Sequence, residues 1–363
     1  MDFGGHPFTL DHLLRYARTA EQLGFDMLCA NDHLVFEVPW LDGPTALTAV
    51  IEASGQMTLA TTVALVAVRG PVPVAKALAA IDRLSGGRLL VAAGPGSSPG
   101  DYHSVGVEFG QRWARLDEAV HALRVLWGKD PEPFTGRFYS TDGIDLQPRP
   151  AQAGGPPIWI GSWGSAAGLR RVARLGDGWL ASAYNTTPVL FAEALTCLNG
   201  YLADHGKNPA TFPNALATMW FYITENPSEA DHIFRHRVVP TINRPESLLR
   251  ERLPIGPAGA FADLVAAFKA AGLQRVLLWP VADEGRQLEL FYEKVALAVL
   301  LGRPPTLGHQ IRRFPRGRPA PFRTVPDLGF VSPPCPCQSR ASQSCLSVWL
   351  PAWLPSQPVS VVV

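Results

Sequence analysis

The sequence lacks several patterns that would place it in common classes of protein. Its net charge is only +1, so the charge balance gives no sign of nucleic-acid or acidic-membrane binding. No run reaches the ~18 uncharged apolar residues that a membrane helix needs, and no basic segment precedes an apolar core as in a signal peptide. We therefore predict a cytoplasmic protein that binds neither nucleic acid nor membrane.

Patterns typical of metal sites and hydrolases are also missing. The five cysteines have no spacing typical of a disulfide framework, which favours a reduced protein. Cys335 and Cys337 are too close for a zinc knuckle and have no histidine nearby. His232 and His236 lie four residues apart but lack the glutamate of a zinc protease, and no Gly-x-Ser-x-Gly elbow occurs. We expect no bound metal.

What is present is an alternation of apolar strands and helices over the first 301 residues. Such alternation predicts parallel strands joined by right-handed crossovers, hence an α/β fold of the (β/α)₈ TIM-like barrel type. Seven strands are predicted, one short of a closed barrel. The first strand is apparently truncated, so either the start is cut or the barrel closes imperfectly. The predicted strands are 25–30, 58–68, 88–93, 157–160, 178–181, 216–223 and 275–279.

Residues 302–363 have a different composition. They contain twelve prolines, seven arginines, no lysine and a single acidic residue. Such a segment buries too little apolar surface to offset its ordering entropy. We predict a Pro/Arg-rich disordered tail, interpreted as a non-native extension. The alternative is a Pro-rich ligand for a partner domain.

The first candidate for chemistry is the run Asn31-Asp32-His33, directly after a predicted strand. Active sites of parallel barrels lie at the carboxyl ends of the strands. A histidine there can act as acid or base near neutral pH, and an adjacent carboxylate can orient it. The alternative is that Asp32 caps a turn and His33 is an ordinary loop residue.

Two glycine-rich segments follow other predicted strands. Gly94-Pro95-Gly96-Ser97 would let the backbone approach a ligand closely, although an ordinary flexible loop looks the same. The second segment leads into a helix, where free amides, small side chains and a serine hydroxyl form a phosphate site or simply a well-capped helix. That segment includes Gly161, Trp163, Gly164, Ser165 and Ala166.

Taken together, the segments resemble the luciferase-like oxidoreductases, in particular the branch that uses the deazaflavin F420. The similarity runs from about residue 13 to residue 301 and rests on the order and spacing of several motifs. These are Ala20–Asp26, Asn31–Leu34, Ala75–Arg88, Arg112–Glu118, Pro157–Gly161 and Gly176–Trp179.

The resemblance implies roles for several of these residues. Family members have a non-prolyl cis peptide in a strand bulge that backs the cofactor ring, which corresponds here to Thr62-Val63. The strand-end histidine corresponds to His33 with Asp32 beside it, and amides near Val63 would stabilise the cofactor anion. The loop 94–97 would border the cofactor, and residues 164–166 would hold its phosphate.

One departure concerns an acidic residue. Several F420 enzymes of the family place a glutamate in the loop after the fourth strand, where this sequence has Ser97, with Asp101 as the nearest carboxylate. That substitution puts a glucose-6-phosphate type of reaction in doubt. Trp40 is interpreted either as a wall of the substrate pocket or as part of the core.

Three functions remain open from the sequence. The first is F420-dependent hydride transfer to or from a small organic substrate. The second is an FMN-dependent monooxygenase that uses O₂ and a partner flavin reductase. The third is a non-catalytic relative disabled by the cut first strand. The resemblance also implies a homodimer.

Overall fold

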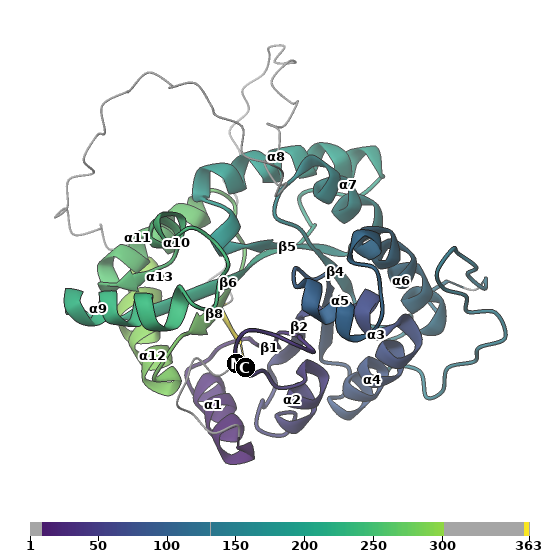
Figure 1. Ribbon diagram of the computed structural model, residues 1–363, viewed down its shortest axis with the longest axis horizontal. Helices are drawn as coiled ribbons and strands as arrows, with labels where there is room; N and C mark the ends of the chain where they lie inside the picture. Colours follow the sequence, from purple (N-terminus) through teal and green to yellow (C-terminus); the bar gives the residue numbers. More distant parts are fainter. Residues whose placement is uncertain (1–8, 131, 301–358, 363) are drawn as a thin grey trace, which may run out of the picture.

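The chain forms a barrel of parallel strands surrounded by helices (Figure 1). The computed structural model describes residues 9–130, 132–300 and 359–362. Within these residues, eight parallel strands pair in the order β5-β4-β3-β2-β1-β9-β8-β6, and the ring is closed because β5 and β6 also pair with each other. The two-residue strand β7 (Ile255–Gly256) pairs in parallel with the end of β6. The ring contains β1 (Met27–Ala30), β2 (Thr58–Ala64), β3 (Leu89–Ala93), β4 (Ile158–Gly161), β5 (Gly178–Ser182), β6 (Asn214–Ile223), β8 (Val276–Pro280) and β9 (Val359–Val362).

The eighth place in the ring is taken by the end of the chain. β9 pairs with β8 through Val276↔Val359 and with β1 through Met27↔Ser360, both in parallel. These four residues belong to the tail that we predicted to lack regular structure, so that prediction is wrong for them. The remainder of the predicted tail, 301–358 and 363, lies outside the described residues.

Helices cover the outside of the ring (Figure 1). The first helix, α1, begins at a side-chain cap, since the Thr9 hydroxyl accepts a hydrogen bond from the His12 amide at 3.3 Å. No helix within the described ranges is long and apolar enough to cross a membrane. The α-helices are α1 (Leu10–Gln22), α2 (Gly43–Ala49), α3 (Val66–Arg69), α4 (Pro71–Leu84), α5 (Pro99–Ser104), α6 (Arg112–Leu126), α7 (Ala166–Leu175), α8 (Pro188–Asp204), α9 (Pro227–Ile233), α10 (Glu246–Arg252), α11 (Ala258–Ala270), α12 (Glu284–Leu290) and α13 (Leu297–Leu300).

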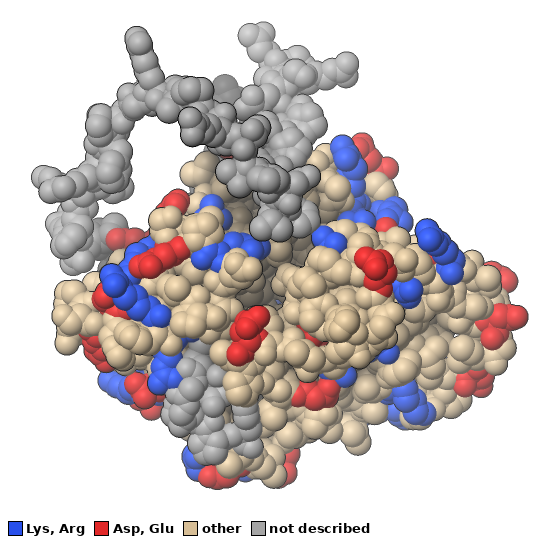
Figure 2. Space-filling model, in the orientation of Figure 1, with Lys and Arg blue, Asp and Glu red and all other residues tan. Residues whose placement is uncertain are grey.

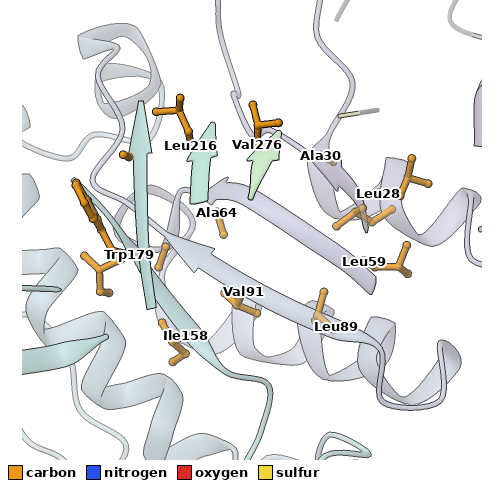
Figure 3. Close-up of a cluster of buried hydrophobic side chains, with 14 of the residues drawn as sticks. Leu28, Ala30, Leu59, Ala64, Leu89, Val91, Ile158, Trp179, Leu216 and Val276 are labelled. Carbon is orange, nitrogen blue, oxygen red and sulfur yellow. The ribbon is translucent and has the colours of Figure 1, made fainter. Parts of the chain in front are cut away.

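Successive side chains along each strand point to opposite faces, and this divides the core into two layers. Leu28, Leu59 and Val91 belong to the cluster between the strands and the helices (Figure 3). Their neighbours Cys29 and Ala60 belong to the cluster inside the barrel. This period of two is what a strand buried on both faces produces. All seven predicted strands are confirmed, but the strand predicted over 58–68 ends at Ala64, and Val66–Arg69 forms α3 instead.

Candidate active site

A bulge in β2 forms one wall of the barrel mouth. The Thr62-Val63 peptide bond is cis, and the register between β2 and β3 shifts between Thr62 and Ala64. This confirms the pair expected from the family resemblance. The Thr62 hydroxyl oxygen is buried and, within the described residues, has no hydrogen-bond partner. Buried polar atoms are nearly always satisfied, so this atom suits a ligand at the bulge.

Two glycines make room for the bulge. A Cβ on Gly94, just after β3, would lie 2.6 Å from Val63 Cγ2. A Cβ on Gly161, at the end of β4, would lie 3.1 Å from Val63 Cγ1. Because neither position carries a side chain, the Val63 side chain packs directly on the backbone of two neighbouring strand ends. The predicted residues Val63, Gly94 and Gly161 therefore form one surface.

The first two residues of the run after β1 tie that strand to the bulge. Asn31 Oδ1 accepts a hydrogen bond from the Val63 amide at 3.1 Å, and Asp32 Oδ2 accepts one from the Leu65 amide at 3.1 Å. Among the amides near Val63 that we expected to stabilise a cofactor anion, the Val63 amide itself is already used within the protein, and the expectation stays a prediction for its neighbours. Asn31 and Asp32 fix the shape of the bulge.

Asp32 does not orient His33, contrary to the sequence-based expectation. Its carboxylate is 1% exposed and binds the guanidinium of Arg69, with the shortest N–O distance at 2.5 Å. Arg69 also contacts Asp42 at 2.5 Å. Burial alone would raise the pKa of Asp42, but hydrogen bonds from Thr45 and the charge of Arg69 lower it below its ordinary value. The Asp32–Arg69 pair is a buried structural ion pair.

The partner of His33 is Asp101, on α5. His33 Nδ1 lies 2.7 Å from Asp101 Oδ2, and the two side chains are 9% and 1% exposed. Asp101 Oδ1 accepts hydrogen bonds from the amides of Leu34 at 2.7 Å and Val35 at 2.9 Å. An ionised carboxylate only accepts, so Nδ1–H donates to it, and in the neutral tautomer with this arrangement Nε2 is the basic nitrogen.

Aromatic rings surround His33 and continue across the mouth. The ring of Phe36 stacks on His33 with centroids 4.2 Å apart, and Trp40 meets it edge-on at 4.8 Å. Trp40 in turn contacts Trp279 of β8, which contacts Trp220 of β6 at 5.4 Å. Trp40 is thus both packed on the interior cluster and in contact with the candidate base.

The glycine-rich loop after β3 is ordered by its neighbours. Gly96 has φ +72°, and a Cβ there would lie 2.7 Å from Leu65 Cδ2. The Tyr102 hydroxyl donates to the Pro95 carbonyl oxygen, which ties the loop to α5. Ser97 is exposed. The loop therefore packs on β2 and the residue after it, through Gly94 on Val63 and Gly96 on Leu65. That it borders a cofactor stays a prediction.

The segment after β4 builds a helix start beside this surface. Ser165 caps α7, its hydroxyl accepting from the Gly168 amide at 3.2 Å, and the Gly164 amide donates to the Ser162 hydroxyl at 3.3 Å. The amides of Ala166 and Ala167 lie in the first turn, where a helix provides no acceptor. Trp163 is 45% exposed next to them. This start can accept an anion.

Sequence reasoning missed the roles of Asp101 and Arg69. The sequence marks Asp101 only as the carboxylate nearest to Ser97, and it assigns no role to Arg69. Both lie tens of residues from the groups they bind, so no local pattern connects them.

The space-filling view shows a hollow at the centre of the face that Figure 1 displays, where the strands meet (Figure 2).

A profile of the luciferase-like monooxygenase family matches residues 2–312. The chain belongs to that family.

Curated relatives include F420-dependent enzymes. The chain is 29% identical over 214 residues to an F420-dependent hydroxymycolic acid dehydrogenase of Mycobacterium tuberculosis, covering 56% of this chain and 57% of the relative. It is 33% identical over 187 residues to an F420-dependent glucose-6-phosphate dehydrogenase of Intrasporangium calvum, covering 48% of this chain and 53% of the relative. The chain thus matches little more than half the length of these relatives.

Solved structures show the same fold. An F420-dependent secondary alcohol dehydrogenase in complex with an F420–acetone adduct superposes with a TM-score of 0.71 at 19% identity, covering 80% of this chain and 96% of the other. A monooxygenase from Streptomyces bottropensis superposes with a TM-score of 0.70 at 21% identity, covering 79% and 92%. The predicted barrel class and family resemblance are confirmed.

Proposed function

We propose that this protein transfers a hydride between F420 and a small organic substrate, with His33 as the acid–base residue. The observation that carries the proposal is the His33–Asp101 pair, held at 2.7 Å at the end of β1 beside the β2 bulge. The F420-dependent enzymes among the curated relatives support the choice of cofactor.

The residues at the mouth fit a tricyclic ring with a phosphate. Val63 and the side-chain-free positions Gly94 and Gly161 make a smooth backing surface. The unpartnered Thr62 hydroxyl offers a polar contact there. The start of α7, at Ser165 and Ala166, would hold the phosphate. When bound, F420 supplies the two-electron chemistry as acceptor or donor of a hydride.

The chain itself manages the proton. Asp101 keeps the proton of neutral His33 on Nδ1, so Nε2 accepts the hydroxyl proton as an alcohol is oxidised to a carbonyl compound and its hydride leaves. In reduction, Nε2 returns a proton to the carbonyl oxygen. Phe36 and Trp40 both pack against the imidazole and against each other, which limits access of water to it. Positioned acid–base groups of this kind contribute about 10²–10⁴-fold to the rate.

The test is the variant His33→Ala, compared with His103→Ala, which removes an exposed histidine two residues from Asp101. We expect His33→Ala to lower turnover by roughly 10²–10⁴-fold while F420 affinity changes little. Equal losses of turnover and affinity would contradict the catalytic role. Oxygen-dependent turnover with FMN and a flavin reductase, and none with F420, would instead identify the alternative, an FMN-dependent monooxygenase.

A further inference from the structure

Two partly buried arginines, Arg244 and Arg252, lie at the barrel mouth. Arg244 lies between β6 and α10, two residues before α10 begins, and Arg252 is the last residue of α10. Within the described ranges, neither lies within ion-pair distance of a carboxylate. Arg244 contacts the Asn185 side-chain oxygen at 3.4 Å and donates to the Asn243 carbonyl at 2.8 Å. Arg252 donates from Nη1 to the Tyr184 carbonyl at 3.1 Å, and its buried Nε has no partner.

Arg88, which is also partly buried, donates to three backbone carbonyls and to the Ser54 hydroxyl. Four other partly buried arginines pair with aspartates. The pairs are Arg69 with Asp32, Arg124 with Asp177, Arg171 with Asp117, and Arg275 with Asp26. Removing a cation from water without a counter-charge is costly, and folded proteins compensate this cost with an anion or with complete hydrogen bonding. Neither compensation is complete at Arg252, and Arg244 has only neutral partners.

The position of these arginines indicates which ligand would supply the missing charge. The Arg244 guanidinium carbon lies 5.1 Å from the ring centre of Trp163 and 6.0 Å from that of Tyr184. Trp163 lies three residues before the start of α7. Arg252 binds the backbone of the same Tyr184. Figure 2 shows basic side chains gathered near α10 at the rim of the central hollow.

We propose that Arg244 and Arg252 form a binding site for an anionic oxygen group, a phosphate or a carboxylate, of the ligand that occupies the barrel mouth. The identity of that ligand rests on the proposed function. The group comes either from the cofactor phosphate at α7 or from an acidic substrate. A guanidinium presents a planar fork of donors that matches both groups, and its stacking on Trp163 pre-orients that fork.

The experiment measures binding of inorganic phosphate by calorimetry at low ionic strength, in the full chain and in Arg244→Ala, Arg244→Lys and Arg252→Ala. The matched control is Arg235→Ala, which removes an exposed arginine paired with Asp231. Loss of a hydrogen bond to a charged group predicts roughly tenfold to hundredfold weaker binding in Arg244→Ala. Arg244→Lys should recover part of that loss, and Arg235→Ala should bind as the unaltered chain does. Equal phosphate binding by the chain and Arg244→Ala, or none by the chain, overturns the proposal.

A second measurement identifies the source of the anion. FMN and riboflavin differ only by the phosphate, so both are titrated with each variant, and F420 is compared with its phosphate-free deazaflavin. A loss in Arg244→Ala confined to the phosphorylated compounds assigns the site to the cofactor. Unchanged cofactor affinity, with loss of phosphate binding to the cofactor-loaded protein, assigns it to the substrate. If the chain binds phosphate through Arg244 but binds no ring compound, the proposed function fails while this inference stands.

Discussion

Asp101→Asn tests the pairing on which the acid–base assignment depends. The asparagine side chain has nearly the shape of aspartate, and its oxygen can still accept from the amides of Leu34 and Val35. Its amide nitrogen would face His33 Nδ1, which then has to accept rather than donate. The proton moves to Nε2, and the neutral ring loses its basic nitrogen on that side.

The expected magnitudes for this variant differ between stability and turnover. Folding loses one hydrogen bond to a charged group, worth about 1.5–3 kcal/mol. Turnover loses the general base, a factor of about 10²–10⁴. The affinity for the cofactor should stay within about threefold of that of the unaltered chain, because the surface at Val63, Gly94 and Gly161 is untouched. A threefold change in affinity corresponds to a binding free energy of ~0.7 kcal/mol. Urea unfolding, steady-state kinetics and fluorescence titration measure the three quantities.

The control for this experiment is Asp42→Asn, since Asp42 contacts Arg69 but is 41% exposed and does not contact His33. It should reduce stability slightly and leave turnover nearly unchanged. If Asp101→Asn retains turnover within about fivefold of the original, a difference of ~1 kcal/mol, then the His33–Asp101 pair does not set the protonation of the base. If turnover and stability fall to the same extent in both variants, Asp101 is only structural.

Two further predictions concern the parts that shape the mouth. Gly94→Ala places a methyl group 2.6 Å from Val63 Cγ2. We therefore expect the free energy of unfolding to fall by about 1–3 kcal/mol and the cofactor to bind more weakly. Tighter cofactor binding would show that this close packing does not shape the surface at Val63, Gly94 and Gly161. Deletion of residues 359–363 leaves β1 and β8 without the strand between them. At ~0.5–1.5 kcal/mol for each net hydrogen bond lost, it should cost several kcal/mol in urea unfolding, and unchanged stability would show that β9 does not close the ring.

Much of the framework could be predicted from the sequence, because its signals are local. Apolar strands such as Leu89–Ala93 and amphipathic helices such as α7 have periods that are readable in short windows. The Thr62-Val63 bulge was found only through the family resemblance. The side chains that hold the bulge in shape are those of Asn31 and Asp32. They accept hydrogen bonds from the amides of residues 32 and 33 positions further along the sequence.

What the sequence could not provide are pairings between distant segments. Asp32 is adjacent to His33 in sequence, yet the carboxylate that binds the imidazole is Asp101, 68 positions away. The segment Val359–Val362 is short, apolar and preceded by prolines, so nothing local indicates that it pairs with β1 and β8. Register between remote strands depends on which edges the rest of the barrel leaves open, which is a property of the whole fold.

The central claim, that the barrel mouth binds a deazaflavin, is tested most directly by fluorescence titration of the full chain with F420 and, separately, with FMN. Trp163 is exposed beside the start of α7, and Trp40 contacts His33, so ring binding should quench tryptophan emission. We expect saturable quenching by F420 at lower concentration than by FMN, and weaker F420 binding in Gly94→Ala. Absence of saturable quenching by either compound would contradict the account.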